Sequence, residues 1–158
     1  MDKEHPITVV LADDHAIVRE GFAALCASHG MQILGQASDG LSALELIGRG
    51  RPDFAILAYP GYLKAKDKDE LTPGLRVPPG TPPVFLAHGG DDIISPPEHS
   101  VLMYLALKRA GIPAELHVYA GSTHDFGVRT NEHSCSAWTE ACTNWLRQQG
   151  FLNPVSTP

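Results

Sequence analysis

The chain lacks the features that would place it in a membrane or on a nucleic acid. No apolar run in its 158 residues approaches the roughly 20 that a membrane-spanning helix needs. Its 12 Lys and Arg residues form no cluster and the formal net charge is −6, so the electrostatic footprint of a nucleic-acid binder is absent. The polar segment 1–6 does not read as a signal peptide. These absences predict a cytoplasmic protein with neither a membrane nor a nucleic-acid partner.

The chain also has too few cysteines for a disulfide framework. It contains three, Cys26, Cys135 and Cys142, and an odd count without paired spacing is not typical of stapled secreted domains. Cys135 and Cys142 fall on one predicted helix, about 10 Å apart along its axis, which is too far for a bridge. We therefore expect reduced structural cysteines.

What is present is an ordinary globular composition, 43% hydrophobic and 19% charged, arranged as strands that alternate with helices. The predicted strands are 7–12, 32–36, 54–57, 84–87 and 115–119. Helices are predicted over the apolar stripes Val18, Phe22, Leu25 and Leu41, Leu44, Ile47, and over 97–110 and 134–149. This alternation predicts an α/β fold in a single domain, 1–158, with a tail at 154–158. Its sheet is expected to be five-stranded, parallel and doubly wound, in the flavodoxin-like order 2-1-3-4-5 with helices on both faces.

One stretch, 58–82, departs from this pattern. It has little apolar periodicity, and it holds a charged run over 64–70 followed by several prolines. A loop of this length in a small domain is either functional or inherited from a larger structure. A short helix over 67–71 is expected inside it.

Two adjacent carboxylates, Asp13 and Asp14, end the first predicted strand. Ligands of open α/β sheets bind at the carboxyl ends of strands, and paired carboxylates suit a hard cation such as Mg²⁺. The same pair also favours the start of a helix, so the pattern alone indicates at most a weak magnesium site.

Residues 7 to about 53 resemble the receiver domain of two-component response regulators. The matching strings are Ala12-Asp13-Asp14-His15, Val18-Arg19-Glu20-Gly21, Gly35-Gln36-Ala37 with Asp39-Gly40, and Arg51-Pro52-Asp53. The resemblance implies that Asp13 and Asp14 belong to an acidic pocket that binds Mg²⁺ during phosphotransfer.

The positions that should complete a receiver carry the wrong residues. By the resemblance, the phosphoacceptor Asp falls at Ala58, the switch Ser or Thr near Ala87, and the Lys near Tyr119 or Ala120. Without a carboxylate at position 58 there is no nucleophile for phosphoryl transfer. We therefore expect at most a vestigial, weak Mg²⁺ site and no phosphorylation.

From Arg51 onward the chain resembles the C-terminal half of an α/β-hydrolase of the acetyl-esterase and lipase-like group. The resemblance is carried by Pro83-Val84-Phe85-Leu86-Ala87-His88-Gly89-Gly90-Asp91-Asp92, by Gly121-Ser122-Thr123-His124-Asp125-Phe126-Gly127 and by the intervening 98–119. It implies that Asp92 is the triad acid and His124 the base, with the choice of Asp92 over Asp91 resting on the family pattern. His88 is expected to be structural.

The nucleophile of such a hydrolase is not found in the chain. No Gly-x-Ser-x-Gly elbow occurs anywhere, and receiver-like sequence occupies the place where it should lie. An Asp–His pair without serine and oxyanion hole loses most of its rate enhancement. The other histidines show no metal-ligand spacing, so a zinc site is not expected.

These observations favour a chimera, engineered or recombined, of a receiver-derived half, 1–50, and a hydrolase-derived half, 51–153. We expect a scaffold without a complete active site or native biochemical activity, without a cofactor beyond weak Mg²⁺, and monomeric or weakly dimeric. Two alternatives stay open. One is a residual weak esterase that uses Asp92 and His124, and the other is a pseudo-receiver that binds a partner without being phosphorylated.

Overall fold

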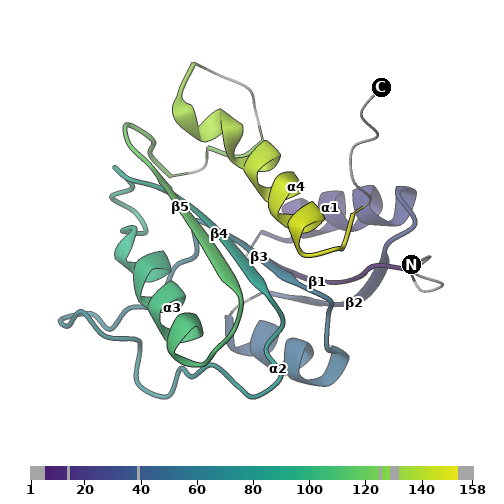
Figure 1. Cartoon of the computed structure of the whole chain (residues 1–158), viewed down its shortest axis with the longest axis horizontal. Coiled ribbons are helices and arrows are strands. Elements are labelled where there is room, and N and C mark those ends of the chain that lie inside the picture. Colours follow the sequence, from purple (N-terminus) through teal and green to yellow (C-terminus); the bar gives the residue numbers. More distant parts are fainter. Residues whose placement is uncertain (1–5, 14, 39, 125, 129–131, 153–158) are drawn as a thin grey trace. The chain divides into compact units, whose positions relative to one another are not determined.

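A computed structural model describes residues 6–13, 15–38, 40–124, 126–128 and 132–152 of the chain (Figure 1). The elements in chain order are β1 (Thr8–Ala12), α1 (Ala16–Ser28), β2 (Gln32–Ala37), α2 (Gly40–Gly50), β3 (Ala55–Ala58), β4 (Val84–Gly89), α3 (Glu98–Arg109), β5 (Ala114–Tyr119), the 3-10 turn η1 (Ser134–Ala137) and α4 (Trp138–Gln148). They belong to two compact units, Met1–Ala55 with Val77–Pro83 and Ile56–Arg76 with Val84–Pro158. The predicted single domain and its halves stay predictions, and the tail 154–158 lies outside the described residues.

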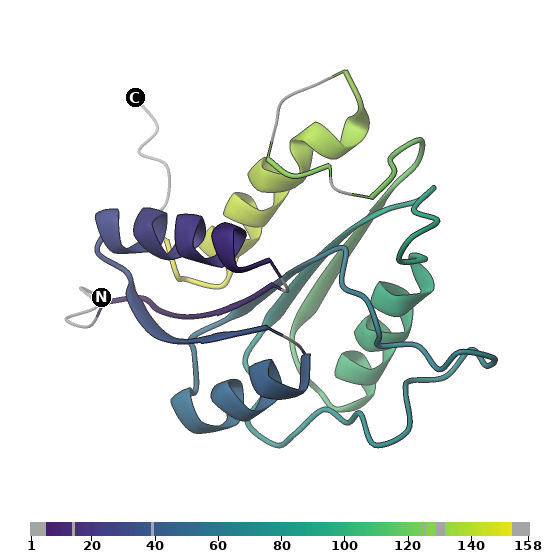
Figure 2. The same cartoon turned by 180° about the vertical axis from the view of Figure 1, so that it is seen from behind.

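The first unit is a pair of parallel strands with a helix on each face. β1 pairs with β2 in parallel, and α1 and α2 lie on opposite sides of the pair (Figure 2). α2 packs so closely that a Cβ built on Gly35 would meet Leu46 Cδ2 at 2.9 Å. Phe22, predicted in the buried stripe of α1, is instead 47% exposed. The side chains of Val18, Leu25, Leu41 and Leu44 lie outside what the structure describes.

The second unit is built around β4, the central strand of the sheet β3-β4-β5. Every residue of β4 is buried, because α3 covers one face of the sheet and α4 the other (Figure 1). A strand covered on both faces reads as a continuous apolar run, as Val84 to Ala87 does.

Aromatic packing fixes α4 against this sheet. Phe85 is fully buried, and its ring centroid lies 5.7 Å from that of Trp145 and 5.3 Å from the imidazole of His117. Trp145 and Cys142 on α4 are 2% and 4% exposed. Burial raises the pKa of the Cys142 thiol to about 12, so it stays protonated and behaves as an apolar group.

The structure confirms the α/β class with parallel pairing, but not the single predicted sheet. The described strands form a two-stranded sheet, β1-β2, and a three-stranded sheet, β3-β4-β5, so the order 2-1-3-4-5 in one sheet is not confirmed. The helix predicted over 134–149 is divided into η1 and α4. Among the described residues no helix is long and apolar enough to cross a membrane.

The expected helix over 67–71 is wrong, because the segment is a turn. Leu71 forms an antiparallel bridge with Lys64, the N–H of Ala65 donates to the carbonyl of Glu70, and the N–H of Thr72 donates to the carbonyl of Leu63. The charged run therefore closes a hairpin-like loop, and Lys64 Nζ lies 3.4 Å from Asp69 Oδ1. Part of the long loop is thus organised by its own backbone hydrogen bonds.

The absence of a side chain at Gly89 lets two loops meet at the end of β4. A Cβ built on Gly89 would lie 2.4 Å from the carbonyl oxygen of Ser122 and 2.6 Å from that of Thr123. Both obstacles are backbone atoms, which cannot rotate away as a flexible side chain would. The position therefore requires glycine if the loop after β5 is to keep its path.

We predict that Gly89→Ala lowers the free energy of unfolding by at least about 1–3 kcal/mol, the usual effect of overpacking. Urea unfolding followed by circular dichroism measures it. Gly48→Ala is the matched control, because a Cβ there meets nothing within 4 Å and alanine favours a helix by about 1 kcal/mol. An unchanged urea midpoint for Gly89→Ala would contradict the close approach.

Candidate functional site

The candidate site lies at the carboxyl ends of β4 and β5. The two strands run parallel with Gly89 opposite Tyr119, so the loops that follow them begin side by side. Backbone hydrogen bonds join these loops, from Gly90 N to Tyr119 O at 2.7 Å and from Asp91 N to Ser122 O at 3.0 Å. This is the edge where open α/β sheets place functional groups.

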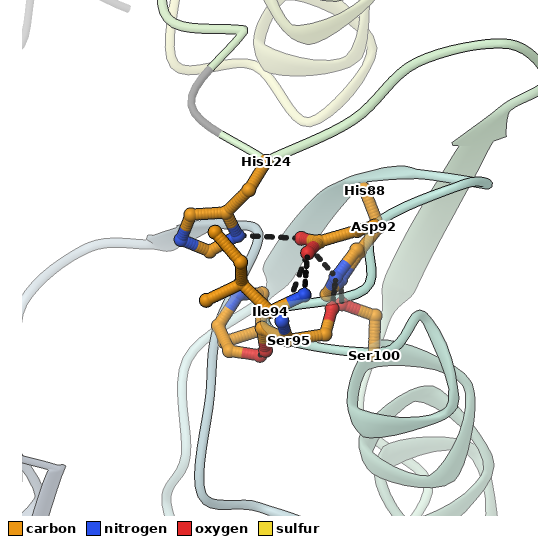
Figure 3. A network of polar contacts seen from close by, with 7 residues as sticks. His88, Asp92, Ile94, Ser95, Ser100 and His124 are labelled. Atoms are coloured by element: carbon orange, nitrogen blue, oxygen red, sulfur yellow. Dashed lines mark hydrogen bonds and ion pairs between the residues drawn. The ribbon is translucent and has the colours of Figure 1, made fainter.

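Asp92 and His124 meet at this edge (Figure 3). His124 Nδ1 lies 2.6 Å from Asp92 Oδ2, while Asp92 Oδ1 accepts hydrogen bonds from the N–H groups of Ile94, at 2.9 Å, and Ser95, at 2.8 Å. The Asp92 side chain is fully buried, and that of His124 is 21% exposed. Both carboxylate oxygens are therefore occupied, and only the imidazole reaches solvent.

The charge state of the pair follows from these contacts. Burial alone raises the pKa of Asp92, but the hydrogen bonds from His124, Ser95 and Ile94 outweigh it and hold that pKa below its usual range. The carboxylate is therefore ionised at neutral pH and can only accept, so the proton between the two groups is donated by His124 Nδ1. The lone pair of the neutral ring is then on Nε2.

His88 supports the same turn from inside the core. It is fully buried; its Nε2 lies 2.7 Å from the carbonyl oxygen of Ser95 and 3.3 Å from Asp92 Oδ2, and its Nδ1 lies 2.7 Å from Ser100 Oγ (Figure 3). Burial lowers the pKa of His88, so the ring is neutral. Because a carbonyl only accepts, Nε2 carries the proton and Nδ1 accepts from the Ser100 hydroxyl. His88 thus fixes the turn that presents Asp92, in agreement with its expected structural role.

The aromatic ring of Tyr59 contacts the imidazole of His124. The ring of Tyr59, which directly follows β3, lies 5.0 Å from it edge to face, and the ring of Phe126 lies 4.9 Å from that of Tyr59. Tyr59 has a φ of +37°, a conformation that non-glycine residues rarely adopt. Strained backbone of this kind persists where the surroundings hold it, often at functional sites.

Within the second unit, the long loop is attached to α3 through His99. His99 Nδ1 accepts from the N–H groups of Leu63, at 3.0 Å, and Lys64, at 2.8 Å. Burial lowers the pKa of His99, and the positive charge of Lys64 lowers it further. Protonation of Nδ1 would remove the acceptor, so the attachment depends on a neutral ring.

This attachment makes stability dependent on pH. A histidine whose folded pKa lies below the unfolded value of about 6.5 contributes stability that is present above that value and is lost as pH falls through the folded pKa. We predict that His99→Asn, whose amide oxygen can accept both N–H groups without titrating, reduces the stability loss between about pH 7 and pH 5 by about 1 kcal/mol, the scale of one backbone hydrogen bond.

Urea unfolding of the wild type and His99→Asn across this pH range is the measurement. His29→Asn, which changes an exposed histidine at the end of α1, is the control and should keep the wild-type slope. An identical slope for His99→Asn and the wild type would show that the loop does not depend on neutral His99.

Of the receiver-like acidic pair, the structure describes Asp13. Asp13 Oδ1 accepts a hydrogen bond from the N–H of His15 at 2.7 Å and lies 3.3 Å from its ring nitrogen, while Arg19 donates to the Asp13 carbonyl. Asp14 lies outside the described residues. Within the described ranges no group of three or more His, Cys, Asp and Glu side chains could hold a metal ion. The weak Mg²⁺ site predicted at Asp13 and Asp14 therefore stays a prediction.

The structure brings together the acidic residue and the histidine predicted in the hydrolase-like part. It joins Asp92 to His124 and leaves the neighbouring Asp91 exposed. The roles of Asp92 and His124 as acid and base stay proposals. Sequence reasoning did not identify Ser95, Ser100 and His99, because nothing in the local pattern distinguishes their hydrogen bonds.

The hydrolase resemblance is matched by a family model described as the prolyl oligopeptidase family, over residues 21–150. Its match begins inside the segment predicted to derive from a receiver. Among solved structures, the acetyl ester-xyloside bifunctional hydrolase from Caldicellulosiruptor lactoaceticus has a TM-score of 0.67 at 20% identity, covering 97% of this chain and 87% of that one. A propionate-bound thermophilic esterase from Thermogutta terrifontis has a TM-score of 0.62 at 16% identity, covering 98% and 87%. These structures show a shared fold.

The receiver resemblance is matched by curated response regulators. The probable transcriptional regulatory protein NarL of Mycobacterium tuberculosis is 46% identical over 54 residues, or 34% of this chain and 25% of that protein. The oxygen regulatory protein NreC of Staphylococcus epidermidis is 40% identical over 50 residues, or 31% and 23%. The chain spans about a quarter of the length of these relatives. Receiver-like and hydrolase-like sequence are thus both present in one chain.

Proposed function

The chain belongs to the prolyl oligopeptidase family, and from this premise we propose that it is a recombined scaffold, natural or engineered, which keeps the acid–base pair of a hydrolase without a complete active site. The observation that carries the proposal is the 2.6 Å hydrogen bond between His124 Nδ1 and the buried Asp92 carboxylate. The pair is assembled, yet the sequence contains no Gly-x-Ser-x-Gly elbow to supply a nucleophile.

The receiver-like part is proposed to be equally incomplete. Ala58 ends β3, where the resemblance places the phosphoacceptor, and Ala87 is fully buried in β4, where it places the switch hydroxyl. Neither side chain can accept or bind a phosphoryl group. The predicted sheet order 2-1-3-4-5 belongs to this proposal and is supported by the order found within each of the two sheets.

The chemistry left to the pair is weak ester hydrolysis, which we propose as the second candidate function. The Asp92 carboxylate orients the imidazole and stabilises its positive form, and His124 Nε2 can take a proton from water. Without serine and oxyanion hole the loss is several orders of magnitude relative to a complete triad. Any turnover should therefore be slow and should depend on His124.

We predict no efficient turnover of p-nitrophenyl acetate and no stable labelling by acetyl phosphate, because both nucleophiles are absent. Release of p-nitrophenolate above the buffer rate, and phosphoprotein detected by intact mass, are the measurements. If slow hydrolysis is present, His124→Ala should lower it by about 10²-fold or more.

The controls separate the two halves of the proposal. Ala58→Asp restores the carboxylate at the end of β3 and tests whether its absence alone prevents phosphorylation. Efficient wild-type hydrolysis that survives His124→Ala would contradict the assignment of the base. Stable wild-type phosphorylation would contradict the proposed loss of the acceptor.

A further inference from the structure

We propose that His124 is itself the nucleophile toward activated acyl donors and is acylated at Nε2. The inference deepens the proposed function and rests on it, because it concerns the chemistry of an Asp–His pair that has no serine. Its substrate class is the aryl ester of a small carboxylic acid.

The nucleophile is Nε2 of His124, in the tautomer that Asp92 favours. Asp92 accepts the Nδ1 proton at 2.6 Å, which leaves the lone pair of the ring on Nε2. The carboxylate is fully buried and its other oxygen is held by two backbone N–H groups, so it cannot turn away from the ring. Acylation of Nε2 makes the ring positive, and the adjacent carboxylate stabilises that charge in a partly desolvated position.

A reagent in solution can reach the imidazole of His124 more easily than the carboxylate of Asp92. The His124 side chain is 21% exposed while that of Asp92 has no exposure, so a reagent meets the ring first. The ring of Tyr59 lies beside the imidazole, and the ring of Phe126 lies beside Tyr59, which suits an aryl leaving group. Ile93 and Ile94 follow Asp92 in the chain and are 91% and 72% exposed, so apolar surface is also available for the acyl group.

The reaction balances without a co-reactant other than water. The Nε2 lone pair forms a bond to the carbonyl carbon of p-nitrophenyl acetate, and the carbon–oxygen bond to p-nitrophenolate breaks with its electron pair. The acylimidazolium keeps the Nδ1 proton on the Asp92 side. Water then attacks the acyl carbon, acetate leaves, Nε2 regains its electron pair, and both protons of the water pass to solvent. Only leaving groups about as weakly basic as imidazole depart readily, which confines the reaction to activated esters.

The test is to trap the acyl group on the wild-type chain. The full chain is mixed with p-nitrophenyl acetate, quenched in acid and measured by intact mass, and the acetylated peptide is then sequenced by fragmentation. We expect one acetyl group on His124 that hydroxylamine removes, and a p-nitrophenolate burst. Because the site is read on the wild type, the result does not depend on any variant folding.

Two variants and one matched control sharpen the test. His124→Gln should abolish the burst. Asp92→Asn should lower its rate by at least about tenfold, since the amide donates toward Nδ1 and moves the ring proton to Nε2, the tautomer change that costs a serine triad about 10⁴. His117→Gln is the control, because His117 also contacts a carboxylate, Glu115, at 2.8 Å, but through Nε2 and in a partly exposed pair. It should leave the burst unchanged.

The outcomes distinguish the inference from the proposal beneath it. The inference is overturned if acetyl groups are found only on lysines or on His117. It is also overturned if turnover depends on His124 but no acetyl-His124 is detected; that result assigns His124 to base catalysis and leaves the proposed function standing. Efficient multiple turnover overturns the proposed lack of a complete site, even if acetyl-His124 is detected.

Discussion

The second unit depends on one buried carboxylate, that of Asp92. A carboxylate is strongly disfavoured in a protein interior unless its oxygens are occupied. Here Oδ1 accepts hydrogen bonds from two backbone N–H groups, and Oδ2 accepts one from Nδ1 of His124. The charge therefore holds the turn after β4 and the loop after β5 together. Removing His124 would leave a buried oxygen without this partner, so stability and chemistry are coupled at the residue.

Two other features serve the same contact. Gly89 gives the loop after β5 room to approach, since a Cβ there would meet the carbonyl of Ser122 at 2.4 Å. From inside the core, His88 donates a hydrogen bond to the carbonyl of Ser95 and accepts one from the Ser100 hydroxyl. A geometry supported in this way by the fold can persist after the nucleophile is lost, because none of these contacts needs a serine. This explains why a recombined chain would keep an ordered pair.

The sequence predicted the elements better than the contacts between them. Apolar alternation located all five strands to within about two residues, because buried parallel strands such as β4 read as continuous apolar runs. The motif around Asp92 and His124 identified the pair that the structure joins. Sequence did not predict the hairpin-like closure of 64–71, which depends on backbone hydrogen bonds that no side-chain period records. Nor did it reveal the acceptor role of His99, which needs burial and two N–H groups brought from the loop.

The central claim is that Asp92 fixes His124 as the tautomer protonated at Nδ1. Long-range ¹H–¹⁵N correlation spectra of the histidine-labelled full chain at neutral pH test it most directly, with His124→Gln to assign the signals. The account predicts a protonated Nδ1 and an unprotonated Nε2 for His124, reversed in Asp92→Asn. A wild-type ring protonated at Nε2, with the lone pair facing Asp92, would contradict it.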